Sequence, residues 1–85
     1  MPRRKPRIDL AELGATPAPG LVVQFTYPRC TDCRALEERL RSQGVPLALV
    51  DVSRQPDLAK KYGVSVVPLA VEVDLQGRVL SQVAG

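Results

Sequence analysis

The stretch Leu21-Val-Val-Gln-Phe-Thr-Tyr-Pro-Arg-Cys-Thr-Asp-Cys33 decides how this chain is interpreted. Its first six residues are rich in β-branched and aromatic side chains, which is typical of a strand buried on both faces. Pro28 ends that run, and a pair of cysteines follows in CxxC spacing. A helix that begins at this motif holds both side chains at the same end, within reach of a disulfide bond. The stretch therefore predicts a buried strand followed directly by a helix that carries the cysteines.

The two cysteines are expected to have different surroundings. Cys30 precedes the first turn of the predicted helix, where unpaired N–H groups favour a thiolate over a thiol. Arg29 and Arg34 flank the pair and favour the thiolate further, whereas Asp32 opposes it. Cys33 lies one turn deeper and is expected to be partly covered. An exposed nucleophile beside a shielded resolving thiol is what dithiol exchange requires, so Cys30 is the candidate nucleophile and Cys33 the candidate resolving cysteine.

Other interpretations of the pair stay open. The cysteines can be small buried core residues, or half of a metal site shared by two copies of the chain, which would make the protein a metal carrier. The position of the motif favours a redox role, because it follows a buried strand and begins the helix of a strand–helix–strand unit.

The composition excludes several classes of function. The 85 residues are 45% hydrophobic and 25% charged, which is ordinary for one globular domain. The absence of histidine excludes Ser-His-Asp and Cys-His nucleophile systems, and two cysteines cannot complete a four-ligand zinc site within one chain. Aromatic residues, at 4%, are too few for a base-stacking platform. With no apolar run near the ~20 residues of a membrane helix and no signal peptide, we expect a cytoplasmic protein without metal or cofactor that binds neither nucleic acid nor membrane.

The chain divides into a flexible basic arm at 1–7 and a domain at 8–85. Apolar runs and their Gly and Pro breaks predict these elements in order: a short strand or one helical turn at 8–14, a linker at 15–20, a strand at 21–26, a helix at 31–43, a strand at 45–52, a short helix within 53–62, a strand at 66–73, a turn at 74–77 and a strand at 78–83. The short helix is expected to be capped by Ser53 or Asp57.

Pro68 needs an explanation, because a proline near the start of an apolar run breaks a central strand. A cis Val67–Pro68 peptide bond would turn the chain sharply and let the strand resume after it. A trans proline at the first residue of an edge strand is the alternative. The local sequence does not decide between them.

Three features together resemble the thioredoxin family: the opening stretch, the run Lys61-Tyr-Gly-Val-Ser-Val-Val-Pro68, and a hairpin with a glycine turn between Val71 and Val83. The resemblance covers roughly residues 20–85. It implies an α/β fold with a central mixed sheet flanked by helices, truncated before the terminal helix of the family. It also implies thiol–disulfide exchange on a protein disulfide, with Cys30 attacking and Cys33 resolving. The electron donor, a reductase or another dithiol, is not identified.

The resemblance further implies a surface that binds substrate. In that family a cis-proline faces the cysteine pair, and the residue before it pairs its backbone with the substrate; these positions correspond to Pro68 and Val67. Gly85 falls where the family has a glycine near the substrate groove. Arg29 stands where the family has a tryptophan, directly before the motif.

Several positions depart from the family pattern. Thioredoxins carry a buried aspartate six residues before the first cysteine, which helps to deprotonate the second; here that residue is Gln24, which cannot act as a base. The residues between the cysteines are Thr31-Asp32 rather than Gly-Pro. Glutaredoxins share the Val-Pro pair, but Val71-Glu-Val-Asp-Leu-Gln-Gly77 does not match their glutathione-binding signature. The departures keep open a non-catalytic binding module with this fold.

The end of the sequence leaves the hairpin strands without the family's terminal helix. Their apolar residues are Val71, Val73, Val79 and Val83. Residues 8–14 offer little area to cover them, and a large apolar patch is seldom left exposed on a monomer. We therefore expect a homodimer, or a partner contact, through this face.

Overall fold

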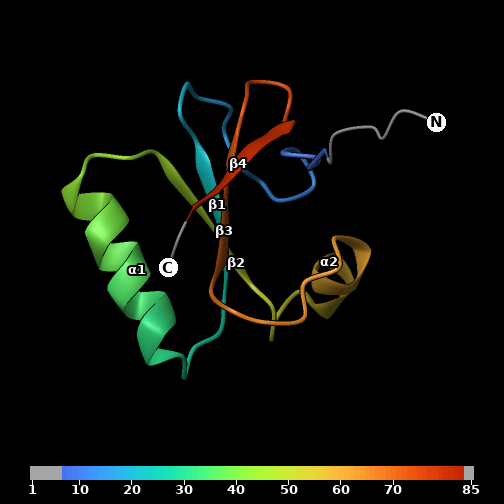
Figure 1. Cartoon of the computed structure of the whole chain (residues 1–85). Helices are drawn as coiled ribbons and strands as arrows, with labels where there is room; N and C mark the ends of the chain where they lie inside the picture. The colour runs from blue at the N-terminus through green and yellow to red at the C-terminus, as the bar shows by residue number, and fades with distance from the viewer. Residues whose placement is uncertain (1–6, 84–85) are drawn as a thin grey trace.

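The computed structural model describes residues 7–83. Its elements are, in order, β1 (Val22–Thr26), α1 (Thr31–Ser42), β2 (Leu47–Asp51), α2 (Pro56–Lys61), β3 (Leu69–Val73) and β4 (Val79–Val83). The strands form one sheet in the order β2-β1-β3-β4, in which β1 is parallel to β2, and β3 is antiparallel to both β1 and β4. Helix α1 covers one face of the sheet, and α2 lies on the other (Figure 1). This is the predicted α/β architecture of a mixed sheet flanked by helices.

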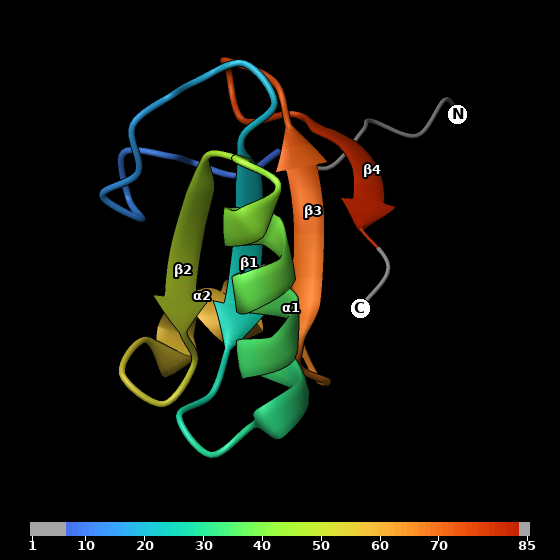
Figure 2. The ribbon, with the colours of Figure 1, turned by 90° about the vertical axis from the view of Figure 1, so that its left-hand side faces the viewer.

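Helix α1 covers the middle of its face and leaves β4 open (Figure 2). The helix begins at the predicted residue, with Cys30 as its N-cap, and Gly44 follows its end with a φ of +73° that suits glycine. Its buried stripe is Cys33, Leu36 and Leu40. The described part of the chain has no helix long and apolar enough to cross a membrane.

The predicted cap of α2 is wrong. Gln55 is the N-cap and makes no side-chain capping bond, while Pro56 occupies the first helical turn, where its missing N–H costs nothing. Ser53 lies before the helix and is bonded to the end of β2: its backbone N–H and its hydroxyl both donate to Asp51 Oδ1, at 2.8 and 2.6 Å. The hydroxyl bond lowers the pKa of Asp51. Asp57 lies inside the first turn of the helix.

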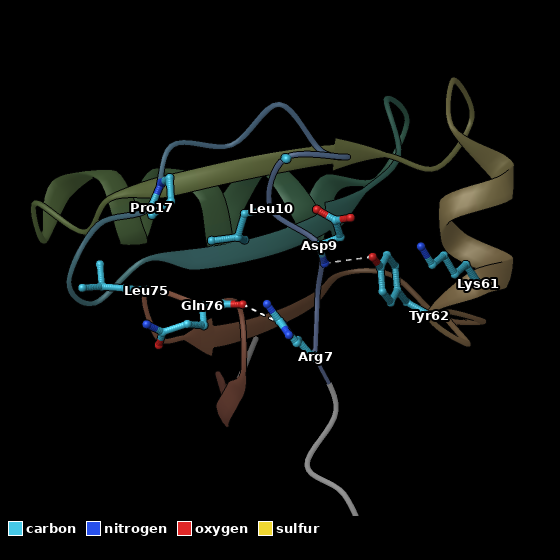
Figure 3. A pocket seen from close by; sticks show the side chains of 9 residues that line it. Arg7, Asp9, Leu10, Pro17, Lys61, Tyr62, Leu75 and Gln76 are labelled. Atoms are coloured by element: carbon cyan, nitrogen blue, oxygen red, sulfur yellow. Dashed lines mark hydrogen bonds between the residues drawn. The ribbon is translucent and has the colours of Figure 1, made fainter.

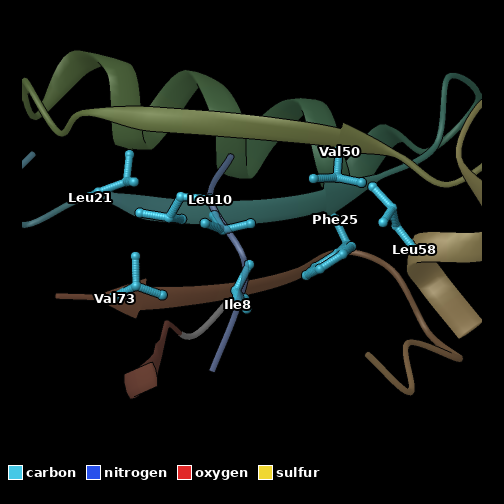
Figure 4. Packing of buried hydrophobic residues seen from close by; sticks show 8 residues of the cluster. Ile8, Leu10, Leu21, Phe25, Val50, Leu58 and Val73 are labelled. Atoms are coloured by element: carbon cyan, nitrogen blue, oxygen red, sulfur yellow. The ribbon is translucent and has the colours of Figure 1, made fainter. Parts of the chain in front are cut away.

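The sheet divides the core into two clusters. The larger one lies on the α2 side and is wholly apolar (Figure 4). Its buried members are Ile8, Leu10, Leu21, Val23, Phe25, Val50, Leu58 and Val73. The smaller one lies under α1 and consists of Val22, Leu36, Leu40 and Ala70. Alternation along β1 sends neighbouring side chains into different clusters.

Residues 7–15, which we call the N-terminal strap, cross the α2 side of the sheet. Arg7, which the sequence placed in the flexible arm, forms an isolated bridge with Arg78; the rest of the arm lies outside the described residues. The Ile8 N–H donates to the Gly77 carbonyl at 2.8 Å. Gly77 has a φ of +86°, and a Cβ there would overlap the Ile8 carbonyl oxygen, so this close crossing requires glycine.

Polar bonds tie the strap to the end of α2. The Tyr62 hydroxyl accepts the Asp9 N–H at 3.0 Å and donates to Glu12 Oε1 at 2.9 Å. Lys61 Nζ donates to both carboxylate oxygens of Glu12, at 2.9 and 3.1 Å. The bond from Lys61, followed by that from Tyr62, lowers the pKa of Glu12, and the same pairing raises the pKa of Lys61.

The N-terminal strap alters the exposure that was expected for the hairpin valines. Val73 is fully buried in the larger cluster, and Val71 and Val79 pack against it from the same face. Val83 points to the other face and packs against the smaller cluster. The apolar patch from which a dimer through this face was expected is therefore largely covered by the chain itself, because Ile8 and Leu10 enter the core.

Candidate functional site

A tight turn joins β1 to α1 and places the cysteines. The Cys30 N–H donates to the Tyr27 carbonyl at 3.1 Å, which closes the turn after the strand. Cys30 itself is extended, with φ −95° and ψ 106°, and the Arg34 N–H donates to its carbonyl at 3.2 Å. The chain thus changes from strand to helix within a few residues, as Pro28 and the CxxC spacing predicted.

Cys30 and Cys33 form a disulfide, with their Cα atoms 5.1 Å apart. The backbone N–H of Cys33 donates to Cys30 Sγ at 3.0 Å, so the first sulfur acts as the cap of the helix. Cys30 is half-buried, whereas Cys33 is fully buried. A capping N–H and the positive end of the helix both stabilise negative charge on the first sulfur. The two cysteines thus differ in burial in the expected direction, with Cys30 less buried than Cys33.

Gln24 lies directly behind the motif. It is fully buried in β1, and its Nε2 donates to the Cys33 carbonyl at 2.8 Å. This bond fixes the orientation of the amide, since only the NH₂ end can donate to a carbonyl. Its Oε1 is buried and has no hydrogen-bond partner among the described residues, a condition that costs about 1–3 kcal/mol. The sequence predicted a residue that cannot act as a base, but it missed the bond to Cys33; a lone polar residue in an apolar strand was the available signal.

The Val67–Pro68 peptide bond is cis, the first of the two alternatives considered for this proline. Pro68 shares a surface hollow of about 580 Å³ with Asp32, which lies between the two cysteines. The other lining residues are Ala35, Leu36 and Arg39, from the following turns of α1. The hollow therefore begins at the cysteine motif and runs along the side of α1.

The remaining predicted site residues lie apart from this hollow. Val67 lines a separate hollow of about 360 Å³ with Val52, Pro56 and Val64, and it packs against the larger core cluster. Arg29 is exposed in the turn just before Cys30. Gly85 lies outside the described residues. The structure thus brings Pro68 beside Asp32 of the cysteine motif, while Val67 lines a separate hollow.

Another hollow, of about 630 Å³, lies under the N-terminal strap (Figure 3). Its charged groups are already engaged: Arg7 Nε donates to the Gln76 carbonyl at 3.0 Å, and Lys61 pairs with Glu12. No residue of the cysteine motif lines it. Across residues 7–83, no three His, Cys, Asp or Glu side chains gather closely enough to hold a metal ion. The chemistry of the described chain is therefore centred on the two sulfurs.

The chain is similar to known proteins in sequence and in structure. Residues 22–74, more than half of the chain, match the family model described as Glutaredoxin. The SPbeta prophage-derived thioredoxin-like protein YosR of Bacillus subtilis is 25% identical over 64 residues, which are 75% of this chain and 80% of YosR. The solved thioredoxin of Fasciola hepatica has a TM-score of 0.65 and 27% identity, over 76% of this chain and 66% of its own. A mutant thioredoxin from Halobacterium salinarum has a TM-score of 0.64 and 28% identity, over 76% of this chain and 60% of its own. The chain spans less than two thirds of the length of these solved thioredoxins.

Proposed function

Because the chain belongs to the glutaredoxin family and has a thioredoxin-like fold, we propose that it catalyses thiol–disulfide exchange through Cys30 and Cys33. The observation that carries the proposal is the difference between the sulfurs. Cys30 is half-buried and its Sγ accepts a backbone N–H at the start of α1, while Cys33 is fully buried one turn below it. A metal carrier would need no such difference, since both thiolates would serve equally as ligands.

The reaction proceeds through a mixed disulfide. The Cys30 thiolate attacks one sulfur of a substrate disulfide; a Cys30–substrate bond forms, and one substrate thiolate leaves and takes up a proton. Cys33 then loses its proton and attacks Cys30 Sγ, which forms the Cys30–Cys33 disulfide and releases the second substrate thiol. The substrate gains two electrons, and a dithiol or a reductase must return two electrons to the protein before the next turnover.

The groups around each cysteine determine how fast its step proceeds. The first step is favoured because the Cys33 N–H and the start of α1 stabilise the attacking thiolate. The second step lacks a carboxylate behind Cys33, since the residue there is the neutral Gln24. The Cys33 proton must therefore leave to water, to Asp32 or to another group, and resolution limits turnover at neutral pH.

Substrate binding is proposed at the edge of the cysteine motif. Pro68 shares a hollow with Asp32, which lies between the two cysteines, and Val67 lines a separate hollow. A substrate segment in extended conformation would pair with the backbone of Val67 and present its disulfide to Cys30. Arg29 would then lie beside the substrate, and we assign Gly85 to the same surface from the resemblance alone.

The reduction of insulin by dithiothreitol tests the activity. We expect the wild-type protein to accelerate insulin precipitation and Cys30→Ser to abolish the acceleration. Cys33→Ser removes the resolving thiol, so the pre-reduced variant, freed of dithiothreitol and mixed with insulin, should accumulate a stable mixed disulfide through Cys30, visible by mass spectrometry. Equal residual turnover in the two variants, or no acceleration by the wild type, would favour the non-catalytic binding module.

A further inference from the structure

The two edges of the sheet differ in how they are protected. At the β4 edge, the pairing with β3 shifts register between Glu72 and Val73, and the exposed side chains include Ser81 and Gln82. Irregular pairing and polar residues keep an edge from pairing with another chain. At the β2 edge, the pairing with β1 runs without a shift from Leu47 to Asp51. Strand β2 contains no proline, lysine or arginine, and Leu49 at its centre is 38% exposed.

The backbone of β2 presents unpaired groups outward. The Val22 N–H donates to the Pro46 carbonyl, and the Val52 N–H donates to the Thr26 carbonyl, so the even-numbered residues direct their backbone groups toward β1. Alternation along the strand directs those of Leu47, Leu49 and Asp51 away from the sheet. The Asp51 carbonyl already accepts two N–H groups of the following turn. Within residues 7–83, β2 pairs with β1 alone.

A hollow of about 420 Å³ lies beside this edge. Residues of the strap and of β2 line it, among them Leu13, Ala15, Leu47 and Leu49, and none of its lining residues is charged. Natural sheets seldom combine an unshifted edge with an apolar exposed centre without covering them.

We infer that β2 pairs antiparallel with β2 of a second copy of this chain, about a two-fold axis at Leu49. In that register the two Leu49 residues exchange a pair of hydrogen bonds, and each Asp51 N–H donates to the Leu47 carbonyl of the other copy. Ala48 lies opposite Val50, and the only charged residue of the strand, Asp51, lies opposite Leu47, so no like charges meet. The sheets of the two copies become continuous.

This arrangement keeps the cysteine sites apart. Strands β1 and β2 are parallel, and the cysteine motif follows the carboxyl end of β1. Antiparallel pairing of the two β2 strands therefore places the two motifs at opposite ends of the joined sheet. Both stay open to substrates, and a metal ion cannot be shared between them in this dimer. The inference is independent of the exchange activity, because it uses neither sulfur.

Sedimentation velocity over a concentration series tests the pairing, with variants that exploit its symmetry. Position 49 faces itself across the axis, so Leu49→Lys places two ammonium groups opposite each other and Leu49→Glu places two carboxylates. We expect either variant alone to weaken dimerisation by at least about tenfold, and an equimolar mixture of the two to recover it. Leu80→Lys is the matched control, because Leu80 is an exposed leucine of the other edge strand, at 52%; it should dimerise like the wild type.

Amide hydrogen exchange gives a second readout that needs no variant. The Leu49 and Asp51 amides should become more protected as the wild-type concentration rises. The inference is overturned by a wild type that stays monomeric throughout the series, by a dimer that both Leu49 variants leave intact, or by a dimer that Leu80→Lys dissolves. It is equally overturned if the Leu49 and Asp51 amides exchange at the same rate in monomer and dimer.

Discussion

The two faces of the sheet have different roles: one contributes most to stability, and the other carries the reactive site. The face under α2 and the N-terminal strap holds a wholly apolar cluster in which Val23, Phe25 and Val73 are at most 1% exposed. The face under α1 holds a smaller apolar cluster, together with Cys33 and the buried polar residue Gln24. Both faces are reached from the same five-residue strand, β1, whose side chains alternate between them.

A small domain can hold a polar group behind its reactive site if the opposite face of the sheet is packed well. A chain of this size has a total stability of about 4–13 kcal/mol, and the unpaired Gln24 oxygen opposes folding by about 1–3 kcal/mol. The α2 face must offset that cost. The strap contributes to it directly, since Ile8 and Leu10 are buried there.

The largest effect on stability is expected when the packing of the apolar α2 face is disrupted. Phe25→Ala empties the middle of the larger cluster and removes the ring contact with Tyr62, whose centroid lies 6.2 Å away. We expect the free energy of unfolding to fall by about 3–5 kcal/mol, measured by urea denaturation of the oxidised protein. Val22→Ala, on the α1 face of the same strand, should cost roughly 2 kcal/mol. Equal losses for the two variants would show that the faces do not differ in this way.

A smaller effect is expected where the strap crosses the hairpin. Gly77→Ala adds a Cβ that overlaps the Ile8 carbonyl oxygen and also forces a side chain into a positive φ. We expect a loss of about 2 kcal/mol, with Ile8 and Leu10 partly displaced and more binding of a dye specific for apolar surface. Gly14→Ala is the control: it has a similar φ of +67° but open space around its Cβ. If the two variants lose the same stability, the crossing of the strap does not require glycine.

The strands and helices could be predicted because each has its own local signal. The apolar run before Pro28, the CxxC at the start of α1 and the glycine after that helix each determine structure over a few residues. The strap could not be predicted, because Ile8 and Leu10 are too few to distinguish a strand from a turn, and their burial depends on Gly77, far along the chain. The prediction of the α2 cap failed for a similar reason, since Ser53 bonds to Asp51 instead of to the helix. At the site, the cysteines were predicted, but the bond from Gln24 to the Cys33 carbonyl required the register of the sheet.

On the α1 face, a side chain that can accept a proton tests what limits the resolution step. Gln24→Asp places a carboxyl group in a buried position, where desolvation raises its pKa toward neutrality, so that it can accept the Cys33 proton. We expect the mixed disulfide of Cys30 with a chromogenic aryl thiol to resolve roughly tenfold faster near neutral pH. Gln24→Asn has the same size and cannot titrate, so it separates the base from the change of shape. Similar rates for the two variants would mean that water or another group takes the proton in the wild type.

The smallest expected effect concerns the polar tie between the strap and α2. Bonds from Lys61 and Tyr62 lower the pKa of Glu12, so its contribution to stability is present above the usual carboxyl pKa of about 4.3 and is lost as the pH falls through the lower folded value. The raised pKa of Lys61 has the opposite sign: its contribution is present below about 10.4 and is lost as the pH rises through the folded value. Glu12→Gln should therefore lower the thermal midpoint slightly at neutral pH and leave it unchanged in strong acid, where the wild-type carboxylate is also protonated. Glu38→Gln, at an exposed glutamate of α1, should show no such pH-dependent difference, and neither variant should change the rate of insulin reduction. A deficit in Glu12→Gln that persists in strong acid would assign the effect to packing of the strap rather than to its charge.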